Sequence, residues 1–352
     1  MIDQMIINNF RGFSSQRVSD LRRVNLIVGK NSSGKTAFLE SIFISAGAAG
    51  PNVTFTLHAM RQLGSQLQLT AEANAYQALW RDLFHWFEQD KTISIEIIGT
   101  AGDSRALHIS YSEFSSQLLP FGSQPSTNPT VLPQIVFEWK KGDEPSIIVK
   151  PKLTSKGLEI EGASVEHFPA MMFGPHITDS AEEVGKRFSE LSKEGKSEIV
   201  LDALKVEYPF LDSLSIEYSS ATPVVFASFK GNRKKLPIAL ISDGINKLLS
   251  ILLGIACFPR GTILIDQIED GFYFDRMSSI WNTIYRFAKD NDSQIFATTH
   301  SMEFLKATRE SMHGKEDDFS LLHAQRDNGS CNIRTIKGKF LEASLEQGIE
   351  VR

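Results

Sequence analysis

A short glycine-rich segment near the amino terminus constrains this chain more than any other feature. It runs from the apolar residues Leu26-Ile-Val28 into Gly29-Lys-Asn-Ser-Ser-Gly-Lys-Thr36 and then into a stretch with helical character. Glycine lets the backbone pass close to an anion, and the N-terminus of the following helix carries the positive end of the helix dipole. A strand, such a loop and a helix in this order predict a phosphate-binding P-loop.

The residue types in this loop suit a nucleoside triphosphate and Mg²⁺. In such loops the backbone N–H groups surround a diphosphate, the lysine reaches the β- and γ-phosphates, and the hydroxyl after it binds Mg²⁺; here these are Lys35 and Thr36. A Gly- and Ser-rich turn with an incidental lysine is the alternative, and the strand and helix on either side argue against it. The residues predicted to contact the nucleotide are Gly29, Asn31, Ser32, Ser33, Gly34, Lys35, Thr36 and Ala37.

The bulk composition sets limits on the class of protein. The 352 residues are 41% hydrophobic and 22% charged, which suits one large domain or two smaller ones. The net charge of −5 does not indicate nucleic-acid binding by the surface as a whole. Two cysteines are too few for a disulfide framework or a structural zinc site. Because we find neither a signal-peptide pattern nor a membrane-spanning stretch, we expect a cytoplasmic protein with no membrane partner.

The chain has motif-rich ends and a middle with few motifs. We expect an α/β fold in a single domain, with residues 1–50 and 236–352 forming a nucleotide-binding core around a mixed central sheet. Residues 51–235 are expected to supply an inserted helical region, antiparallel strands and a helical lobe. The patterns predict strands at 4–8, 24–28, 92–98, 105–112, 133–139, 145–150, 213–219, 223–230, 319–325 and 331–336. They predict helical segments at 35–46, 55–89, 179–206, 276–290 and 340–346, and a loop at 120–129.

An aromatic cluster closes the predicted helical region at 55–89. Its spacing is more typical of a hydrophobic core than of a platform on which bases stack, although both interpretations stay open. The residues are Leu79, Trp80, Leu83, Phe84, Trp86 and Phe87.

Two later segments predict the rest of a nucleotide site. Gly261-Thr-Ile-Leu-Ile-Asp266 is an apolar strand that ends in a carboxylate, the group that holds Mg²⁺ beside a P-loop. Gln294 begins a second buried strand that ends at His300, and the helix at 276–290 between the two strands predicts a βαβ crossover. We therefore interpret Asp266 as a magnesium residue with Thr36, and His300 as a sensor of the γ-phosphate rather than a structural histidine.

A polar turn upstream of these strands opens a strongly apolar helix. Ser242-Asp243-Gly244 is followed by Ile-Asn-Lys247 and then by an apolar run as far as Ala256. A helix N-terminus with Ser and Gly in its first turn is an anion site, but Ser and Asp are common caps. Its position just before the Asp266 strand makes the turn a candidate for nucleotide binding.

These segments together resemble a known family. Their order and spacing are similar to those of the ABC-type ATPases of the overcoming-lysogenization-defect (OLD) family, which are relatives of SMC and RecF proteins. The resemblance covers roughly residues 1–46 and 236–305 and is loose over 50–235. The motifs that carry it are Asn9-Phe-Arg-Gly-Phe13, the P-loop, Ser242–Lys247, Ile263-Leu-Ile-Asp-Gln-Ile-Glu-Asp-Gly271 and Ala297-Thr-Thr-His-Ser301.

The resemblance implies an ABC-type ATPase head that uses ATP and Mg²⁺. It implies that Ser242, Asp243, Gly244 and Lys247 form a signature motif, which contacts the γ-phosphate of ATP bound to a second subunit, so that ATP lies at a homodimer interface. Glu269-Asp-Gly271 would begin the loop across that interface, and His300 would be the switch histidine. Arg11 is a further candidate contact, although its motif also makes a good structural turn.

The sequence departs from the family at one catalytic position. Family members carry a glutamate after the magnesium aspartate, and here that position is Gln267. An amide cannot accept a proton from water at neutral pH, although it can hold the water by a hydrogen bond. The catalytic candidates are thus Gln267, His300 and Lys35, and we expect slow or absent ATP hydrolysis. Two explanations stay open: a Glu→Gln substitution introduced to trap the ATP-bound dimer, or a naturally slow, switch-like ATPase.

The resemblance suggests a defence role. OLD-type proteins often carry a Toprim nuclease domain after the ATPase; its acidic residues are not apparent and the chain leaves no room for it, so we do not expect nuclease activity in cis. We expect an ATPase that regulates a separately encoded effector, a nuclease or toxin, in bacterial anti-phage defence.

Two other functions are open. One is a RecF-like DNA-repair ATPase that binds DNA directly; the other, a transporter ATPase, is disfavoured by Asn9–Phe13 and the long middle region. The candidate DNA contacts, each more typical of solvated surface, are Lys140, Lys141, Lys150, Lys152, Arg233, Lys234 and Lys235.

Overall fold

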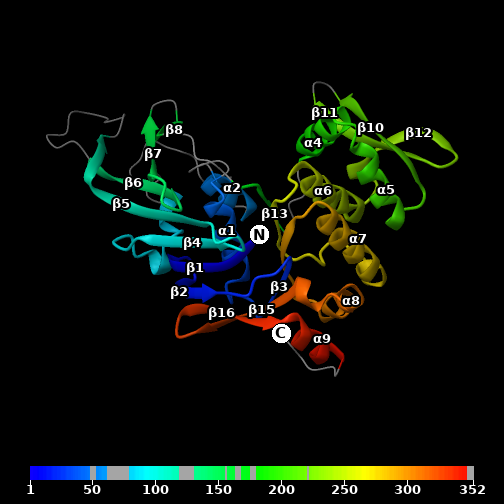
Figure 1. The fold of residues 1–352 in the computed structure, drawn as a ribbon. Helices are drawn as coiled ribbons and strands as arrows, with labels where there is room; N and C mark the ends of the chain where they lie inside the picture. Colours follow the sequence, from blue (N-terminus) through cyan, green and yellow to red (C-terminus); the bar gives the residue numbers. More distant parts are fainter. Residues whose placement is uncertain are drawn as a thin grey trace.

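The computed structural model describes most of the chain. The described residues are 1–47, 53–61, 79–118, 131–154, 157–162, 168–174, 180–219 and 222–346. They form a central sheet between a large antiparallel sheet, on the left in Figure 1, and a helical lobe with a small sheet on the right. The loop predicted at 120–129 and residues 62–78 of the predicted helical region lie outside these residues.

The central sheet carries the P-loop. It runs in the order β16-β15-β3-β14-β13-β9. Neighbours from β15 to β9 are parallel and β16 is antiparallel to β15, so the predicted mixed central sheet is confirmed. Its strands are β3 (Val24–Val28), β9 (Ala170–Phe173), β13 (Thr262–Ile265), β14 (Gln294–Thr298), β15 (Phe319–Asp327) and β16 (Ser330–Lys337).

The large antiparallel sheet runs in the order β2-β1-β4-β5-β6-β7-β8. Alternate residues of its strands point into the core, as Ile93, Ile95 and Ile97 do on β4, because successive side chains of a strand face opposite sides. Its strands are β1 (Ile2–Phe10), β2 (Phe13–Val18), β4 (Ile93–Gly99), β5 (Ser104–Leu118), β6 (Val131–Lys141), β7 (Ile147–Thr154) and β8 (Gly157–Gly162).

Helices cover the central sheet on both sides. The longer ones are α1 (Lys35–Ser45), α2 (Val53–Met60), α4 (Ala181–Lys193), α5 (Ser197–Glu207), α6 (Asp243–Cys257), α7 (Met277–Asp290), α8 (Met302–Met312) and α9 (Gly338–Glu346). Short 3₁₀ turns are η2 (His85–Phe87), η3 (Ile238–Leu240), η4 (Phe274–Arg276) and η5 (Glu316–Asp318). The small sheet joins β10 (Leu211–Ser219), β11 (Thr222–Phe229) and β12 (Asn232–Pro237).

The burial of β3 explains why the P-loop is held firmly. Val24, Leu26 and Val28 enter the core under the helical lobe, whereas Ile27 enters the opposite core together with Phe38 of α1. A parallel strand covered on both faces is mostly apolar, and each fully buried apolar side chain contributes about 1.5–3 kcal/mol. The buried Asn25 of β3 is satisfied by hydrogen bonds to the carbonyl oxygens of Arg22 and Ile295. The P-loop thus begins at the end of a strand that is anchored on both sides.

Several predicted elements differ from the observed ones. The region predicted as helical over 55–89 is helical at 55–60, within α2, and at 79–81. It then turns, because Phe84 bridges to Phe10 of β1. The helical tract at 179–206 is split into α4 and α5 at Gly195, whose φ of 73° suits glycine. The elements that were not predicted are β2, β8, β9, β12 and α8.

Strand β9 shows why some elements escaped prediction. Its residues Ala170-Met-Met-Phe173 include no β-branched side chain, so local propensity does not favour a strand. It forms by parallel pairing with β13, from Thr262 against Ala170 to Ile265 against Phe173. The central sheet therefore includes a strand from residues 51–235, which were expected to lie outside the nucleotide-binding core. Conversely, β1 and β2 come from residues 1–50 of the expected core and lie in the antiparallel sheet.

Candidate nucleotide-binding site

The P-loop requires glycine at both ends of its turn. Gly29 has φ 143° and Gly34 has φ 98°, in the region that other residues rarely adopt. A Cβ on Gly29 would also lie 2.1 Å from the carbonyl oxygen of Ala324 on β15. Lys35 Nζ donates to the carbonyl oxygens of Gly29 at 2.8 Å and Lys30 at 3.0 Å, so its ammonium group lies over the loop.

Thr36 and Asp266 meet at the carboxyl end of the central sheet. Thr36 Oγ1 donates to Asp266 Oδ2 at 2.8 Å, although 230 residues separate them in sequence. Thr298 Oγ1, at the end of β14, donates to the other oxygen of this carboxylate and accepts from the backbone N–H of Gln267 at 2.8 Å. A hydroxyl and a carboxylate held together are the hard oxygen donors that Mg²⁺ prefers, so the residues present fit this ion.

A cavity of about 740 Å³ lies over these groups. The described residues that line it include Asn31, Ser32, Ser33, Gly34, Lys35, Thr36, Ala37, Asp266, Gln267 and His300. All of these were predicted from the sequence as nucleotide, metal or catalytic residues, and the fold brings them to one cavity. Gly29 lies behind them, where its carbonyl accepts from Lys35.

The electrostatics of the cavity are set by Lys35 and the carboxylates beside it. Burial lowers the pKa of Lys35, and the negative charges of Asp266 and Glu269 partly offset this effect. Burial, together with the positive charge of Lys35, lowers the pKa of His300. Both effects favour the neutral imidazole of His300, which has one donor and one acceptor nitrogen.

Glu269 does not line the cavity. Its Oε1 accepts from the backbone N–H of His300 at 2.7 Å, which directs the carboxylate toward the loop after β14. Gln267, in contrast, lines the cavity and has a strained φ of 51°. Of these two residues, Gln267 is the one directed toward the P-loop.

The predicted signature turn lies apart from this cavity. Ser242 caps α6 by accepting from the backbone N–H of Ile245 at 3.2 Å, and Ser242 and Asp243 are exposed. Gly244 is buried against the following loop, since a Cβ there would lie 2.7 Å from the carbonyl oxygen of Gly271. The four predicted residues Ser242, Asp243, Gly244 and Lys247 do not line the cavity of their own chain.

Lys247 points inward rather than toward the exposed turn. Its Nζ donates to the carbonyl oxygens of Gln267 at 3.0 Å and Asp270 at 2.8 Å. Burial lowers its pKa to about 8, against the raising effect of Asp270 and other nearby carboxylates. In this chain Lys247 therefore holds the loop after Asp266, and it does not extend to a ligand at the turn.

The structure adds a buried ionic cluster that the sequence pattern did not reveal. Glu40 of α1 is 1% exposed and accepts from Arg61 Nε at 2.7 Å, with Arg11 Nε at 2.7 Å on its other oxygen. Burial opposes charge on Arg61, but its hydrogen bonds to Glu40 raise its pKa. Arg11 and Arg61 both line the cavity, so this cluster places two guanidinium groups beside the P-loop helix.

The aromatic cluster divides into two parts. Leu79, Trp80, Leu83 and Phe84 are buried, so for them the core interpretation is confirmed. Trp86 and Phe87 are exposed and line the same cavity as the P-loop. Trp86 and Phe87 follow directly after buried aromatic residues, so the spacing of hydrophobic residues in the sequence could not distinguish the exposed pair from the buried residues.

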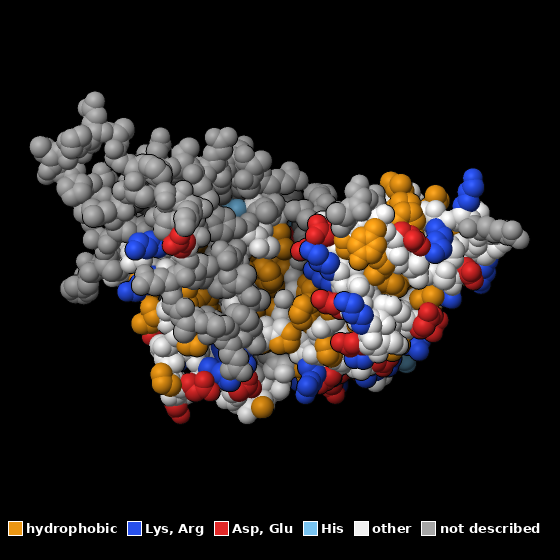
Figure 2. All heavy atoms as spheres, turned by 90° about the horizontal axis from the view of Figure 1, so that it is seen from above, with side chains coloured by type: hydrophobic (Ala, Val, Ile, Leu, Met, Phe, Trp, Pro, Cys, Tyr) orange, Lys and Arg blue, Asp and Glu red, His pale blue; other side chains and the backbone are white. Residues whose placement is uncertain are grey.

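The basic residues considered for DNA binding lie on two different sheets. Lys140 and Lys141 are on β6, and Lys150 and Lys152 on β7, at the left of Figure 1, whereas β12 carries Arg233, Lys234 and Lys235 at the right. Lys235 pairs with Glu217 at 2.8 Å. Figure 2, which views the molecule from above, shows Lys and Arg side chains interspersed with Asp and Glu among the described residues of the face it draws. These residues are not gathered into one basic groove.

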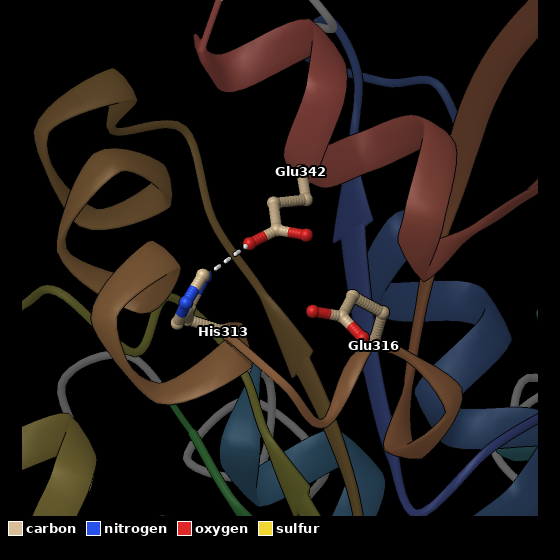
Figure 3. Close-up of side chains that lie close together, drawn as sticks. All are labelled: His313, Glu316 and Glu342. Atoms are coloured by element: carbon tan, nitrogen blue, oxygen red, sulfur yellow. Dashed lines mark hydrogen bonds and ion pairs between the residues drawn. The ribbon is translucent and has the colours of Figure 1, made fainter.

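A separate cluster of potential metal ligands lies at the surface, between α8, η5 and α9 (Figure 3). His313, Glu316 and Glu342 each offer one ligand atom, and these atoms lie within 4.8 Å of one another. His313 Nδ1 is 3.2 Å from Glu342 Oε1, and Glu316 accepts from the backbone N–H of Gly314 at 2.6 Å. These partners satisfy the exposed cluster without an ion.

Fold and site together support a P-loop ATPase of the ABC or SMC-like type. The chain matches the family described as an AAA ATPase domain over residues 1–114. It matches the family described as "AAA domain, putative AbiEii toxin, Type IV TA system" over residues 166–306. The two matches contain the P-loop and the Asp266–His300 segment respectively.

Two known proteins match this chain over nearly its whole length. An "ATP/GTP phosphatase" of Helicobacter pylori (strain ATCC 700392 / 26695) is 21% identical, and the match covers 98% of each chain. An SMC head crystallised with the C-terminal winged-helix domain of ScpA has a TM-score of 0.50 at 11% identity, covering 96% of this chain and 98% of that one. The latter similarity shows the fold alone, which is that of an SMC head. No helix among the described residues is both long and apolar enough to cross a membrane.

Proposed function

We propose that this chain binds ATP with Mg²⁺ in the cavity over the P-loop, hydrolyses it slowly, and completes its site with a second copy of itself. One observation carries the proposal: the P-loop, Asp266, Gln267 and His300 line one cavity, while the predicted signature turn lies outside it. Ser242 and Asp243 are exposed and do not line the cavity of their own chain, so a second copy would bring them to the phosphates.

The roles of the residues follow from their chemistry. Lys35 and the N-terminus of α1 would hold the phosphates, and Arg11 would add a guanidinium group from the side. Thr36 and Asp266 would hold Mg²⁺, which would neutralise charge on the phosphate oxygens. Gln267 would orient the attacking water by hydrogen bonds, and neutral His300 would contact the terminal phosphate. Without a carboxylate at position 267 the water would have no strong base, so turnover would be slow.

We further propose an OLD-type role, in which ATP binding changes the state of the dimer and thereby regulates a separately encoded effector, a nuclease or toxin, in anti-phage defence. The family description that mentions a putative toxin of a toxin–antitoxin system supports this class of function. The "ATP/GTP phosphatase" relative supports turnover of a nucleoside triphosphate. A RecF-like role in DNA repair is the alternative, and the separation of the basic residues on β6, β7 and β12 argues against it.

The dimer is tested by measuring the mass of the chain in solution. We expect a dimer at micromolar concentration with Mg²⁺ and ATP and a monomer without nucleotide. Ser242→Arg should remain monomeric with ATP while retaining ATP binding, because the exposed turn would no longer fit the partner's phosphates. A mass that stays monomeric with saturating ATP would contradict the composite site.

The choice between effector control and DNA repair is tested by titrating DNA over a salt series. Effector control predicts weak binding by the isolated chain. Tight binding that falls steeply with salt would favour the repair function instead.

A further inference from the structure

Two exposed aromatic side chains occupy the outer end of the nucleotide cavity. Trp86 is 61% exposed and Phe87 is 55% exposed, although Trp80 and Phe84, just before them, are almost fully buried. Both have positive φ values, 51° for Trp86 and 61° for Phe87, which bulky residues rarely adopt. Such strain persists where the surrounding structure holds it, often at sites that bind a ligand.

The surroundings hold Trp86 from several sides. The guanidinium of Arg326 lies 5.7 Å from the ring centroid, within the range of a cation–π contact. A Cβ on Gly329 would lie 3.3 Å from the indole ring, so this turn approaches Trp86 closely. The ring centroids of His85 and Trp86 are 6.0 Å apart with the ring planes at 71°, and His85 Nδ1 is 2.8 Å from the carbonyl oxygen of Arg11. The remaining indole surface is open and lines the cavity.

The hairpin of β15 and β16 connects Trp86 to the P-loop. Gly329 and Arg326 lie at its tip beside Trp86, and Cys331 lies on β16 next to the P-loop, where a Cβ on Gly34 would be 2.8 Å from its sulfur. Gly329 and Cys331 are two residues apart, which corresponds to about 7 Å of extended chain. Since β15 also pairs with β3, which leads into the P-loop, the same hairpin contacts both Trp86 and the P-loop.

We propose that Trp86 is the platform on which the base of the bound nucleoside triphosphate stacks. This inference rests on the proposed nucleotide binding and names the part of the ligand that the outer cavity recognises. A ligand anchored by its phosphates at Lys35 extends its ribose and base away from the P-loop, toward this end of the cavity. The base covers the open indole face, while Arg326 supports the ring.

The platform predicts how the site discriminates between ligands. Stacking uses the face of a base, which every base has, and does not read its hydrogen-bonding edge. Trp86 should therefore stabilise ATP and GTP to a similar extent. It should contribute nothing to the binding of inorganic tripolyphosphate, which has phosphates but no base.

The first test follows tryptophan emission of the unmodified chain during titration with Mg²⁺ and each ligand. Of the four tryptophans, Trp80, Trp139 and Trp281 are at most 7% exposed, so Trp86 dominates the solvent-exposed emission. ATP and GTP should quench this emission, and tripolyphosphate should not. Absence of quenching by ATP that calorimetry shows to be bound would overturn the platform.

The second test measures affinities of variants by calorimetry. Trp86→Ala should weaken ATP and GTP binding by roughly tenfold, with tripolyphosphate affinity unchanged, whereas Trp86→Phe should retain most of the ATP affinity. Tyr218→Ala removes an aromatic residue that is 74% exposed on β10 and serves as the matched control. Circular dichroism checks that each variant is folded. If Trp86→Ala does not fold, Trp86→Phe and the quenching measurement on the unmodified chain still test the proposal.

The outcomes separate this proposal from the proposed function. Equal ATP affinity of Trp86→Ala and the unmodified chain, while Lys35→Met loses ATP binding, would overturn the platform and leave nucleotide binding intact. Equal losses for ATP and tripolyphosphate in Trp86→Ala would also overturn it, because Trp86 would then support the P-loop rather than the base. If the unmodified chain bound neither ATP nor tripolyphosphate, the proposed function would fail as well.

Discussion

Two lysines near the starts of two helices have different surroundings in this molecule. Lys35 begins α1 directly after the P-loop, and Lys247 lies in the first part of α6 after the turn at Ser242. Both side chains are largely buried and donate to backbone carbonyl oxygens. Lys35, however, lines the cavity next to Asp266, whereas Lys247 is enclosed by the loop from Gln267 to Asp270.

The difference shows that local sequence alone does not determine the surroundings of a lysine that follows a glycine-containing turn. The carbonyl oxygens around Lys35 belong to a loop that is open toward the cavity, so a phosphate can replace them as its partner. Those around Lys247 belong to a packed segment, and its ammonium group stabilises the conformation that directs Gln267 toward the P-loop. One lysine is open to the cavity, and the other supports the loop that carries Gln267.

The largest expected effect concerns Gln267, which this loop presents. Gln267→Glu should raise the rate of ATP hydrolysis by about 10²–10⁴-fold, since a carboxylate can accept the proton of the attacking water. Turnover is measured at saturating ATP and Mg²⁺. Glu269→Gln is the matched control for the other carboxylate. The double variant Gln267→Glu, Glu269→Gln should hydrolyse ATP as fast as Gln267→Glu alone. Equal rates for the original chain and Gln267→Glu would mean that position 267 does not limit hydrolysis.

The two lysines can be compared directly by the same substitution. Lys35→Met should weaken ATP binding on the order of 100-fold, because charge-assisted hydrogen bonds to the phosphates are lost. Lys247→Met should leave the ATP affinity of the monomer within about twofold but lower turnover in the Gln267→Glu background. Calorimetry at a concentration where the chain is monomeric measures the first quantity. A comparable loss of ATP affinity in both variants would remove the distinction between them.

The smallest expected effect is a dependence of stability on pH. Burial lowers the pKa of Lys247 to about 8, below the ordinary value of 10.5 that it regains on unfolding. Between these values the unfolded chain binds more protons than the folded chain, so stability rises with pH; below pH 8 both states are charged and the contribution is constant. Relative to Lys247→Met, the free energy of unfolding should increase by about 2 kcal/mol from pH 8 to pH 10.

Urea unfolding at several pH values measures this dependence. Lys234→Met, at an exposed lysine, provides the control and should show no such difference from the original chain. A Lys247→Met variant whose stability follows the same pH profile as the original chain would contradict the burial of a titrating ammonium group.

Much of the phosphate end of the site could be predicted from the sequence. Asp266 and His300 follow short buried strands, and the predicted βαβ unit places the ends of β13 and β14 next to each other, as the parallel pairing of these strands confirms. The position of Gln267 followed from that of Asp266. The inward direction of Lys247 could not be predicted, because it depends on how α6 packs against a loop that lies 20 residues further along the chain.

The sequence by itself determined the P-loop, its strand and helix, and the identity of the magnesium and catalytic candidates, because these depend on backbone geometry and residue types within short continuous segments. The tertiary structure decided the outer part of the cavity. Arg61, Trp86 and Arg326 come from three separate segments, and they meet because Glu40 pairs with Arg61 and because the β15–β16 hairpin reaches Trp86. Long-range packing of this kind has no signature in local sequence, so only the folded chain shows where a base can lie.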